Sequence, residues 1–182
     1  MELGEADMTT LVQHTRTCLA SLLAISLGGC WSSSELLITQ ANSVEPVPSG
    51  KYEYHADGDE LQVGLIKFPG GGYIYWNEDG AMPLFVHDIG DNWFVLQLVN
   101  TEDDSGHLFG LGHIEGAKVT IYDPECYEEI LTVEGVDGDT GDCNFKSLDA
   151  LEAASKLAVA KIAAGTDVNV HGWFEMPEKH AD

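Results

Sequence analysis

From residue 51 onward, short apolar runs alternate with turns rich in glycine and aspartate at intervals of roughly ten residues. Such even spacing is typical of an antiparallel meander, in which each short loop returns the chain beside the preceding strand. The pattern predicts a mainly β (α+β) fold whose meander forms a small barrel or a sandwich. The predicted strands span residues 51–55, 61–68, 73–76, 84–87, 93–99, 107–114 and 118–122, with a last one at 168–174.

The strand at 93–99 differs from the others because apolar side chains occupy both of its faces. A strand with only one face on a core alternates apolar and polar residues, so this pattern indicates a central strand that is covered on both sides. One predicted face carries Phe94, Leu96 and Leu98, and the other carries Val95, Gln97 and Val99.

Two segments have the helical period instead. The first is predicted at 124–134, with Asp123 as cap, Pro124 in the first turn and Gly135 just past the end. The second begins at the cap residue Ser147 and ends before Gly165. We expect both helices to belong to the β domain, with the C-terminal one packing on the sheet or plugging a barrel end.

The chain begins with a pattern of a different kind. Arg16 precedes an apolar run at 18–27, which is too short to span a bilayer and has the character of a secretory signal. The run ends in Leu27-Gly28-Gly29-Cys30, which resembles the lipobox of bacterial lipoproteins. The resemblance implies that Cys30 carries acyl chains such as palmitate and that the mature chain starts there. The alternative is an ordinary cleaved signal that happens to contain a cysteine.

The lipobox resemblance also implies a location. It predicts a protein that is lipid-anchored in the bacterial cell envelope and faces the periplasm. Trp31 follows the cysteine in place of the aspartate associated with inner-membrane retention, which favours the outer membrane. The acidic residues Glu2, Glu5 and Asp7 do not suit a signal, so we expect translation to begin at Met8.

Together these patterns divide the chain into three parts. Residues 1–29 are the predicted signal peptide, residues 30–49 a lipidated N-terminus and tether, and residues 50–182 a single β-rich domain with its C-terminal helix. The tether prediction rests on the lack of periodicity and on the prolines near position 47. Docking of Leu36, Leu37 and Ile38 on the domain is the alternative.

Given the lipoprotein resemblance, Cys18 leaves with the signal and Cys30 is used by lipid. Cys126 and Cys143 remain in a chain that has left the reducing cytoplasm, and we therefore expect a disulfide between them. A metal site or a reactive thiol is the alternative, although the two cysteines lack a neighbouring ligand pattern.

Charge excludes one class of partner. The 182-residue chain has a formal net charge of −23, and without residues 1–29 it still carries 28 acidic residues against 7 lysines. Because nucleic-acid binding relies on Lys and Arg against phosphate, no nucleic-acid partner is expected. The expected partners are the membrane, through the lipid anchor, and an envelope protein.

The remaining motifs give little chemistry. The glycines at 70–72 lack the Lys-Ser or Lys-Thr of a phosphate loop, and the acidic loop at 137–142 has Leu148 where a calcium loop needs Glu. His107 and His113 share a predicted strand face and form a candidate metal or acid–base site, which His87 and His171 could join. No motif for a catalytic nucleophile is present, so we expect no catalytic residues, no metal, no cofactor and no enzyme.

The predicted function is therefore that of a non-catalytic accessory or binding protein of the cell envelope. A second hypothesis is a carrier of a small apolar ligand, because a barrel could enclose the many aromatic residues as a pocket. A metal-dependent enzyme is the third. An aromatic-lined pocket without a plugging helix would favour the carrier. The aromatic set comprises Tyr73, Tyr75, Trp76, Phe85, Trp93, Phe94, Phe109, Trp173 and Phe174.

Overall fold

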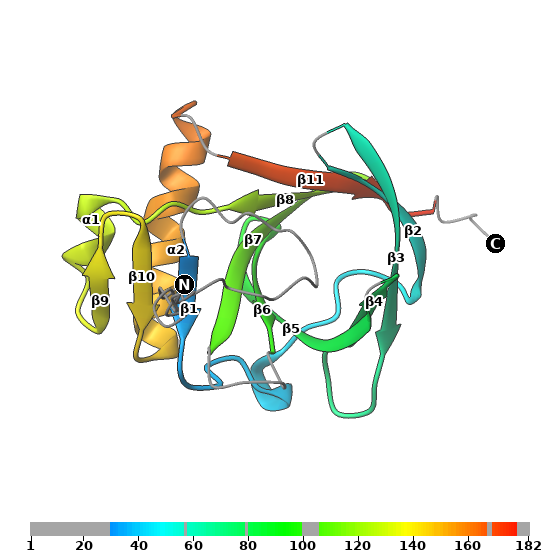
Figure 1. Cartoon of the computed structure of the whole chain (residues 1–182), viewed down its shortest axis with the longest axis horizontal. Helices are drawn as coiled ribbons and strands as arrows, with labels where there is room; N and C mark the ends of the chain where they lie inside the picture. The colour runs from blue at the N-terminus through cyan, green and yellow to red at the C-terminus, as the bar shows by residue number, and fades with distance from the viewer. Residues whose placement is uncertain (1–29, 57, 79, 100–105, 167–168, 178–182) are drawn as a thin grey trace, which may run out of the picture.

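The computed structural model describes residues 30–56, 58–78, 80–99, 106–166 and 169–177. Within these residues eight strands form a closed antiparallel barrel (Figure 1), which confirms the predicted fold class and selects a barrel over a sandwich. The predicted signal peptide, residues 1–29, lies outside the described residues. The barrel strands are β2 (Gly50–Ala56), β3 (Asp59–Lys67), β4 (Tyr73–Asn77), β5 (Gly80–Gly90), β6 (Trp93–Leu98), β7 (His107–Glu115), β8 (Lys118–Asp123) and β11 (Asn169–Glu175).

Strands β2 to β8 pair in the order in which they occur in the chain, as the meander predicts. The last barrel strand, β11, inserts between β8 and β2 and closes the circle. Its pairing with β8 extends from Asn169 to Glu175, whereas its registered pairing with β2 is Trp173 with His55. The β2–β11 seam is therefore the least extensively paired junction among the described strands of the barrel.

A second layer covers the outer wall of β5, β6 and β7 at one side of the barrel (Figure 1). Strand β1 pairs in parallel with β10 and antiparallel with β7, so the barrel sheet continues into this layer. It consists of β1 (Cys30–Ser33), the 3-10 helix η1 (Gln40–Asn42), α1 (Glu128–Leu131), β9 (Val136–Asp139), β10 (Asp142–Phe145) and α2 (Leu148–Ala163).

The two layers produce two hydrophobic cores, one inside the barrel and one between its outer wall and α2. Strand β6 contributes to both: Phe94 packs in the barrel core and Val95 in the outer core. The prediction that this strand is covered on both faces is thus confirmed. Gln97 on the outward face is fully buried, and its amide bonds to Leu37 and Ile38.

The prediction of a free tether at 30–49 is wrong. Trp31 and Ile38 are fully buried in the outer core, and Val47 is buried in the barrel core. Apolar periodicity was absent because this segment follows the outside of a barrel that is built from distant parts of the sequence. Residues 30–49 therefore belong to the folded domain, and for Ile38 the structure shows the docking alternative.

The predicted helix at 124–134 is reduced to the four residues of α1, and Asp123 is not its cap. Asp123 ends β8 and its carboxylate bonds to His171 instead, while the residue that precedes α1 is Tyr127 in an extended conformation. Cys126 lies before the helix, where it forms the predicted disulfide with Cys143 of β10.

Helix α2 agrees with its prediction at both ends. The Ser147 hydroxyl accepts a hydrogen bond from the Ala150 N–H, and Gly165 adopts φ = +72° after the last turn. Its buried side is narrow, with Leu151 beside the alanines at 150, 154 and 158, which lets the helix approach the barrel wall. The helix packs on the outer wall and does not plug a barrel end.

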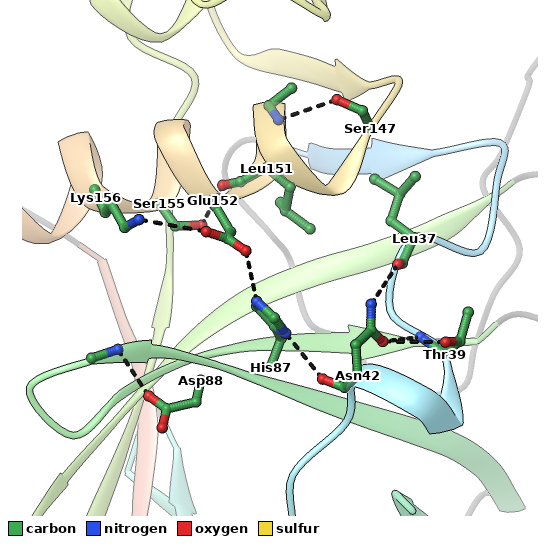
Figure 2. A network of polar contacts seen from close by, with 12 residues as sticks. Leu37, Thr39, Asn42, His87, Asp88, Ser147, Leu151, Glu152, Ser155 and Lys156 are labelled. Atoms are coloured by element: carbon green, nitrogen blue, oxygen red, sulfur yellow. Dashed lines mark hydrogen bonds and ion pairs between the residues drawn. The ribbon is translucent and has the colours of Figure 1, made fainter.

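One polar contact joins three elements at this wall (Figure 2). Figure 2 shows His87 of β5 between Glu152 of α2 and Asn42 of η1. The His87 Nδ1 lies 3.0 Å from the Asn42 carbonyl oxygen, and Nε2 lies 2.9 Å from the Glu152 carboxylate. Both partners are acceptors when Glu152 is ionised, so a His87 ring that carries hydrogen on both nitrogens satisfies them.

None of the described helices is long and apolar enough to cross a membrane.

Candidate functional site: a cavity inside the barrel

The inside of the barrel contains a cavity of about 130 Å³. Its wall is almost entirely apolar and aromatic, because inward positions of the strands carry these side chains in alternation. Inward side chains include Val63 and Leu65 of β3, Tyr73 and Tyr75 of β4, Leu84 and Val86 of β5, Phe94 and Leu96 of β6, Val119 and Ile121 of β8, and Phe174 of β11.

The space exists because β7 presents two glycines to the interior. Gly110 and Gly112 line the cavity between Leu108 and Ile114 of the same strand. An eight-stranded barrel is just wide enough to be filled by side chains or to hold one small ligand. A β carbon added at Gly112 would lie in ordinary contact with Leu96, 3.6 Å away, so the backbone does not require glycine there. The cavity is therefore the space that side chains at positions 110 and 112 would otherwise fill.

One end of the cavity is closed by the strap, residues 43–49, which runs from η1 to β2 (Figure 1). Pro46 and Val47 of the strap line the cavity. The Tyr73 hydroxyl accepts from the Val47 N–H at 2.9 Å and donates to the Val47 carbonyl at 2.7 Å. Burial raises the pKa of the Tyr73 hydroxyl above its usual range, so this group stays neutral and holds the strap in place.

The other end carries a buried polar pair, Asp123 and His171. Asp123 is the last residue of β8, whereas Tyr73 is the first residue of the co-directional strand β4, so the pair and the strap lie at opposite ends. The His171 Nδ1 lies 3.1 Å from the Asp123 Oδ2. The Asp123 side chain is 5% exposed and that of His171 is 13% exposed. Both residues line the cavity.

A β-bulge brings His171 to this position. The register between β8 and β11 shifts between Val170 and Gly172, which leaves His171 as the extra residue. Bulges re-aim side chains and are common beside functional sites. Gly172, the next residue after His171, lies where two strands come close together. A β carbon added there would lie 2.5 Å from the His55 carbonyl oxygen and from the Tyr54 hydroxyl. The Tyr54 ring lies 5.8 Å from the His171 ring.

The pair can do two things chemically. The Asp123 carboxylate fixes hydrogen on Nδ1 of His171 and thereby orients the ring. Nε2 is then the ring nitrogen available to a molecule in the cavity. Among the described lining residues the polar side chains are Asp123, His171 and tyrosines, with no serine, threonine, cysteine or lysine nucleophile. The geometry is that of an apolar cavity with one polar end.

The structure does not bring together the candidate histidine pair on β7. His107 and His113 both face outward, but six residues of extended strand separate them by about 20 Å, which is too far for one metal ion. His113 stacks on Trp93 with ring centroids 4.3 Å apart. His107 has a buried Nδ1 without a hydrogen-bond partner among the described residues, and burial lowers its pKa. His87 and His171, proposed as further members, lie in the separate contacts described above.

In the described part of the chain one group has ligand atoms close enough for a metal ion, namely Glu53, His55 and Glu60 on the outside of β2 and β3. His55 lies 3.6 Å from Glu53 and 3.7 Å from Glu60 through its two ring nitrogens, and it stacks on Trp173. This arrangement is a group of polar contacts on the outer surface of the barrel. The acidic loop at 137–142 is the β9–β10 hairpin, in which Asp137 pairs with Lys146.

The aromatic residues divide between the cavity and the outside. Tyr73, Tyr75, Phe94 and Phe174 line the cavity, as the carrier hypothesis requires, whereas the Phe109 ring packs against Phe145 in the outer core. The three tryptophans of the set lie elsewhere: Trp76 covers Gly64, Trp93 stacks on His113, and Trp173 stacks on His55. Phe85 packs in the outer core.

Sequence reasoning missed Asp123, Tyr54 and the two cavity glycines. Asp123 was assigned to a helix cap because Asp-Pro is a common start signal. The glycines on β7 were visible, but their inward orientation requires the register of the barrel.

Compared with known protein families, curated proteins and solved structures, the chain matches none. The assignment of a function therefore depends on the geometry of the cavity.

Proposed function

We propose that this protein is a non-catalytic binding protein that holds one small, mainly apolar molecule inside its barrel. The observation that carries the proposal is the cavity of about 130 Å³ at Gly110 and Gly112, with aromatic walls and one polar end. A cavity of roughly 150 Å³ lined by apolar side chains holds benzene. The chain thus has room for a compact ligand, and α2 lies outside the barrel where it does not compete for the space.

The lipobox-like sequence adds a location to this proposal. Lipid on Cys30 would anchor the protein in the cell envelope, facing the periplasm, with the outer membrane favoured by Trp31. Because β1 begins at Cys30 and Trp31 is fully buried, such an anchor would join the folded domain without a flexible tether. A carrier held in this way would bind ligand directly at the membrane surface and could pass it to an envelope protein partner.

A graded substitution at Gly112 tests the binding function. Alanine at this position reaches ordinary contact distance from Leu96, and valine extends further into the cavity. We expect toluene affinity, measured by titration calorimetry, to fall about threefold for Gly112→Ala and at least tenfold for Gly112→Val, because the ligand and the new side chain require the same space. Unfolding temperature is the control, and we expect it to stay constant or rise as the cavity fills.

Two results would contradict the proposal. Toluene affinity that is unchanged in a folded Gly112→Val protein would show that ligand binds elsewhere. The absence of toluene binding by the unmodified protein, together with no small molecule in an organic extract of protein purified from its host, would show that the cavity is only a packing defect.

A further inference from the structure

The buried pair at the end of the cavity bears on which molecules can enter it. Asp123 is 4% exposed, and its carboxylate has His171 as its hydrogen-bond partner. Burying a carboxylate and an imidazole in an apolar chamber costs free energy, and packing alone would be served better by apolar side chains. The bulge in β11, which places His171 at the cavity, is a second departure from regular structure at the same point.

We infer that the ligand is a neutral hydroxyl compound with a compact apolar body, such as a monocyclic phenol or a small cyclic alcohol, and that His171 bonds its hydroxyl group. This inference rests on the proposed function and assigns its ligand class. A hydroxyl group can donate to Nε2 of a neutral ring or accept from a protonated one, so it satisfies His171 in either form.

Charge and size exclude the other common classes. An anionic ligand would approach the Asp123 carboxylate in a chain whose formal net charge is −23, and repulsion opposes it. A long acyl chain needs far more than about 130 Å³. A ligand without a polar group would leave Nε2 of His171, whose side chain is 13% exposed, facing an apolar surface without a hydrogen-bond partner from the ligand.

Asp123 is a positioning residue in this arrangement. It contacts His171 and fixes the ring, whereas His171 contacts the ligand. Tyr73 at the far end is already bonded twice to the backbone of Val47 and has little capacity left for a ligand. The apolar body of the ligand would therefore lie toward Tyr73 and the strap, with its hydroxyl toward His171.

The test compares phenol, toluene and benzoate, which share a ring and differ in the polar group. Affinities for the purified protein are measured by titration calorimetry, and the decisive quantity is the phenol-to-toluene affinity ratio. We expect His171→Phe to lower this ratio at least tenfold while toluene still binds, and Asp123→Asn to lower it less. His113→Phe, an equivalent change on the outer face of β7, should leave the ratio unchanged. Retained toluene binding shows in each variant that the barrel is intact.

The outcomes separate the ligand class from the binding function. A ratio that His171→Phe leaves unchanged, or tighter binding of benzoate than of phenol, overturns the inference while cavity binding stands. If neither phenol nor toluene binds to the unmodified protein, the binding function itself fails and the inference fails with it. Should His171→Phe not fold, the ratio measured with Asp123→Asn decides.

Discussion

At the scale of single residues, three polar side chains with little exposure each bond a particular backbone or side-chain group. Gln97 bonds the backbone of residues 37 and 38, His171 bonds Asp123, and His87 bridges Asn42 and Glu152. The sequence shows these residues only as interruptions of apolar strands, because their partners lie between 45 and 65 positions away. Residue-level prediction was therefore better for local features, such as the Ser147 cap, than for the cavity.

The Glu152–His87 contact leads to a prediction about pH. The hydrogen bond from His87, with a smaller contribution from Lys156, holds the pKa of the Glu152 carboxyl below its usual range. Ionised Glu152 therefore stabilises the fold fully above the pKa that it has in the unfolded chain, and this contribution disappears as pH falls through the lower pKa of the folded state. We expect Glu152→Gln to destabilise by about 1 kcal/mol at pH 7 and by nearly nothing at pH 3.

Urea unfolding of both proteins at the two pH values measures this difference. Glu134→Gln, a change at an exposed carboxylate, serves as the control and should have little effect at either pH. A cost of Glu152→Gln that is the same at pH 3 and pH 7 would show that the contact does not depend on the charge of the carboxylate.

At the scale of elements, patterns that repeat along a short segment were sufficient to predict the strand or helix that the segment forms. The meander, the two-faced strand β6 and helix α2 follow from period and turn residues. The disulfide follows from the cysteine count together with the lipobox resemblance. The failures are the segments whose structure depends on distant partners. Residues 30–49 show no hydrophobic period because they follow the barrel wall. Helix α1 is shorter than predicted, and Asp123 does not cap it because its carboxylate bonds to His171 of β11.

Docking of residues 30–49 on β6 can be tested through Gln97. Its side chain accepts from the N–H groups of Leu37 and Ile38 at 3.1 and 2.8 Å and donates to the Ile38 carbonyl. Replacing it with Leu leaves these backbone groups buried without partners, so we expect Gln97→Leu to lower the free energy of unfolding by about 2–3 kcal/mol. Amide hydrogen exchange at residues 37 and 38 should accelerate as well.

Thr120→Val on β8 is the control, since it replaces a polar strand residue at a partly exposed position. Equal unfolding free energies for Gln97→Leu and Thr120→Val, with unchanged exchange at 37 and 38, would mean that the segment is held by its apolar contacts alone.

At the scale of the whole molecule, barrel closure and the second layer decide where the site lies. Closure depends on β11, which is separated from β8 by α1, the β9–β10 hairpin and α2, and no local pattern shows that a strand will return across such a distance. The same long-range pairing places β1 between β7 and β10. The predicted anchor residue Cys30 thereby belongs to the side of the molecule that carries β9 and β10, whereas β2 and β3 form the opposite side (Figure 1).

This arrangement predicts how a lipid-anchored form would sit on a membrane. With lipid on Cys30 and no free tether, the β9–β10 side should face the headgroups and the β2–β3 side should face away. In nanodiscs containing lipids with nitroxide headgroups, we expect NMR signals of residues 136–145 to broaden strongly and those of residues 59–67 to stay sharp. The Cys30→Ser protein, mixed with the same nanodiscs, should show no strong broadening on either side. Equal broadening on both sides in the lipidated protein would mean that the barrel tumbles freely on a tether, and would refute the orientation that the burial of Trp31 implies.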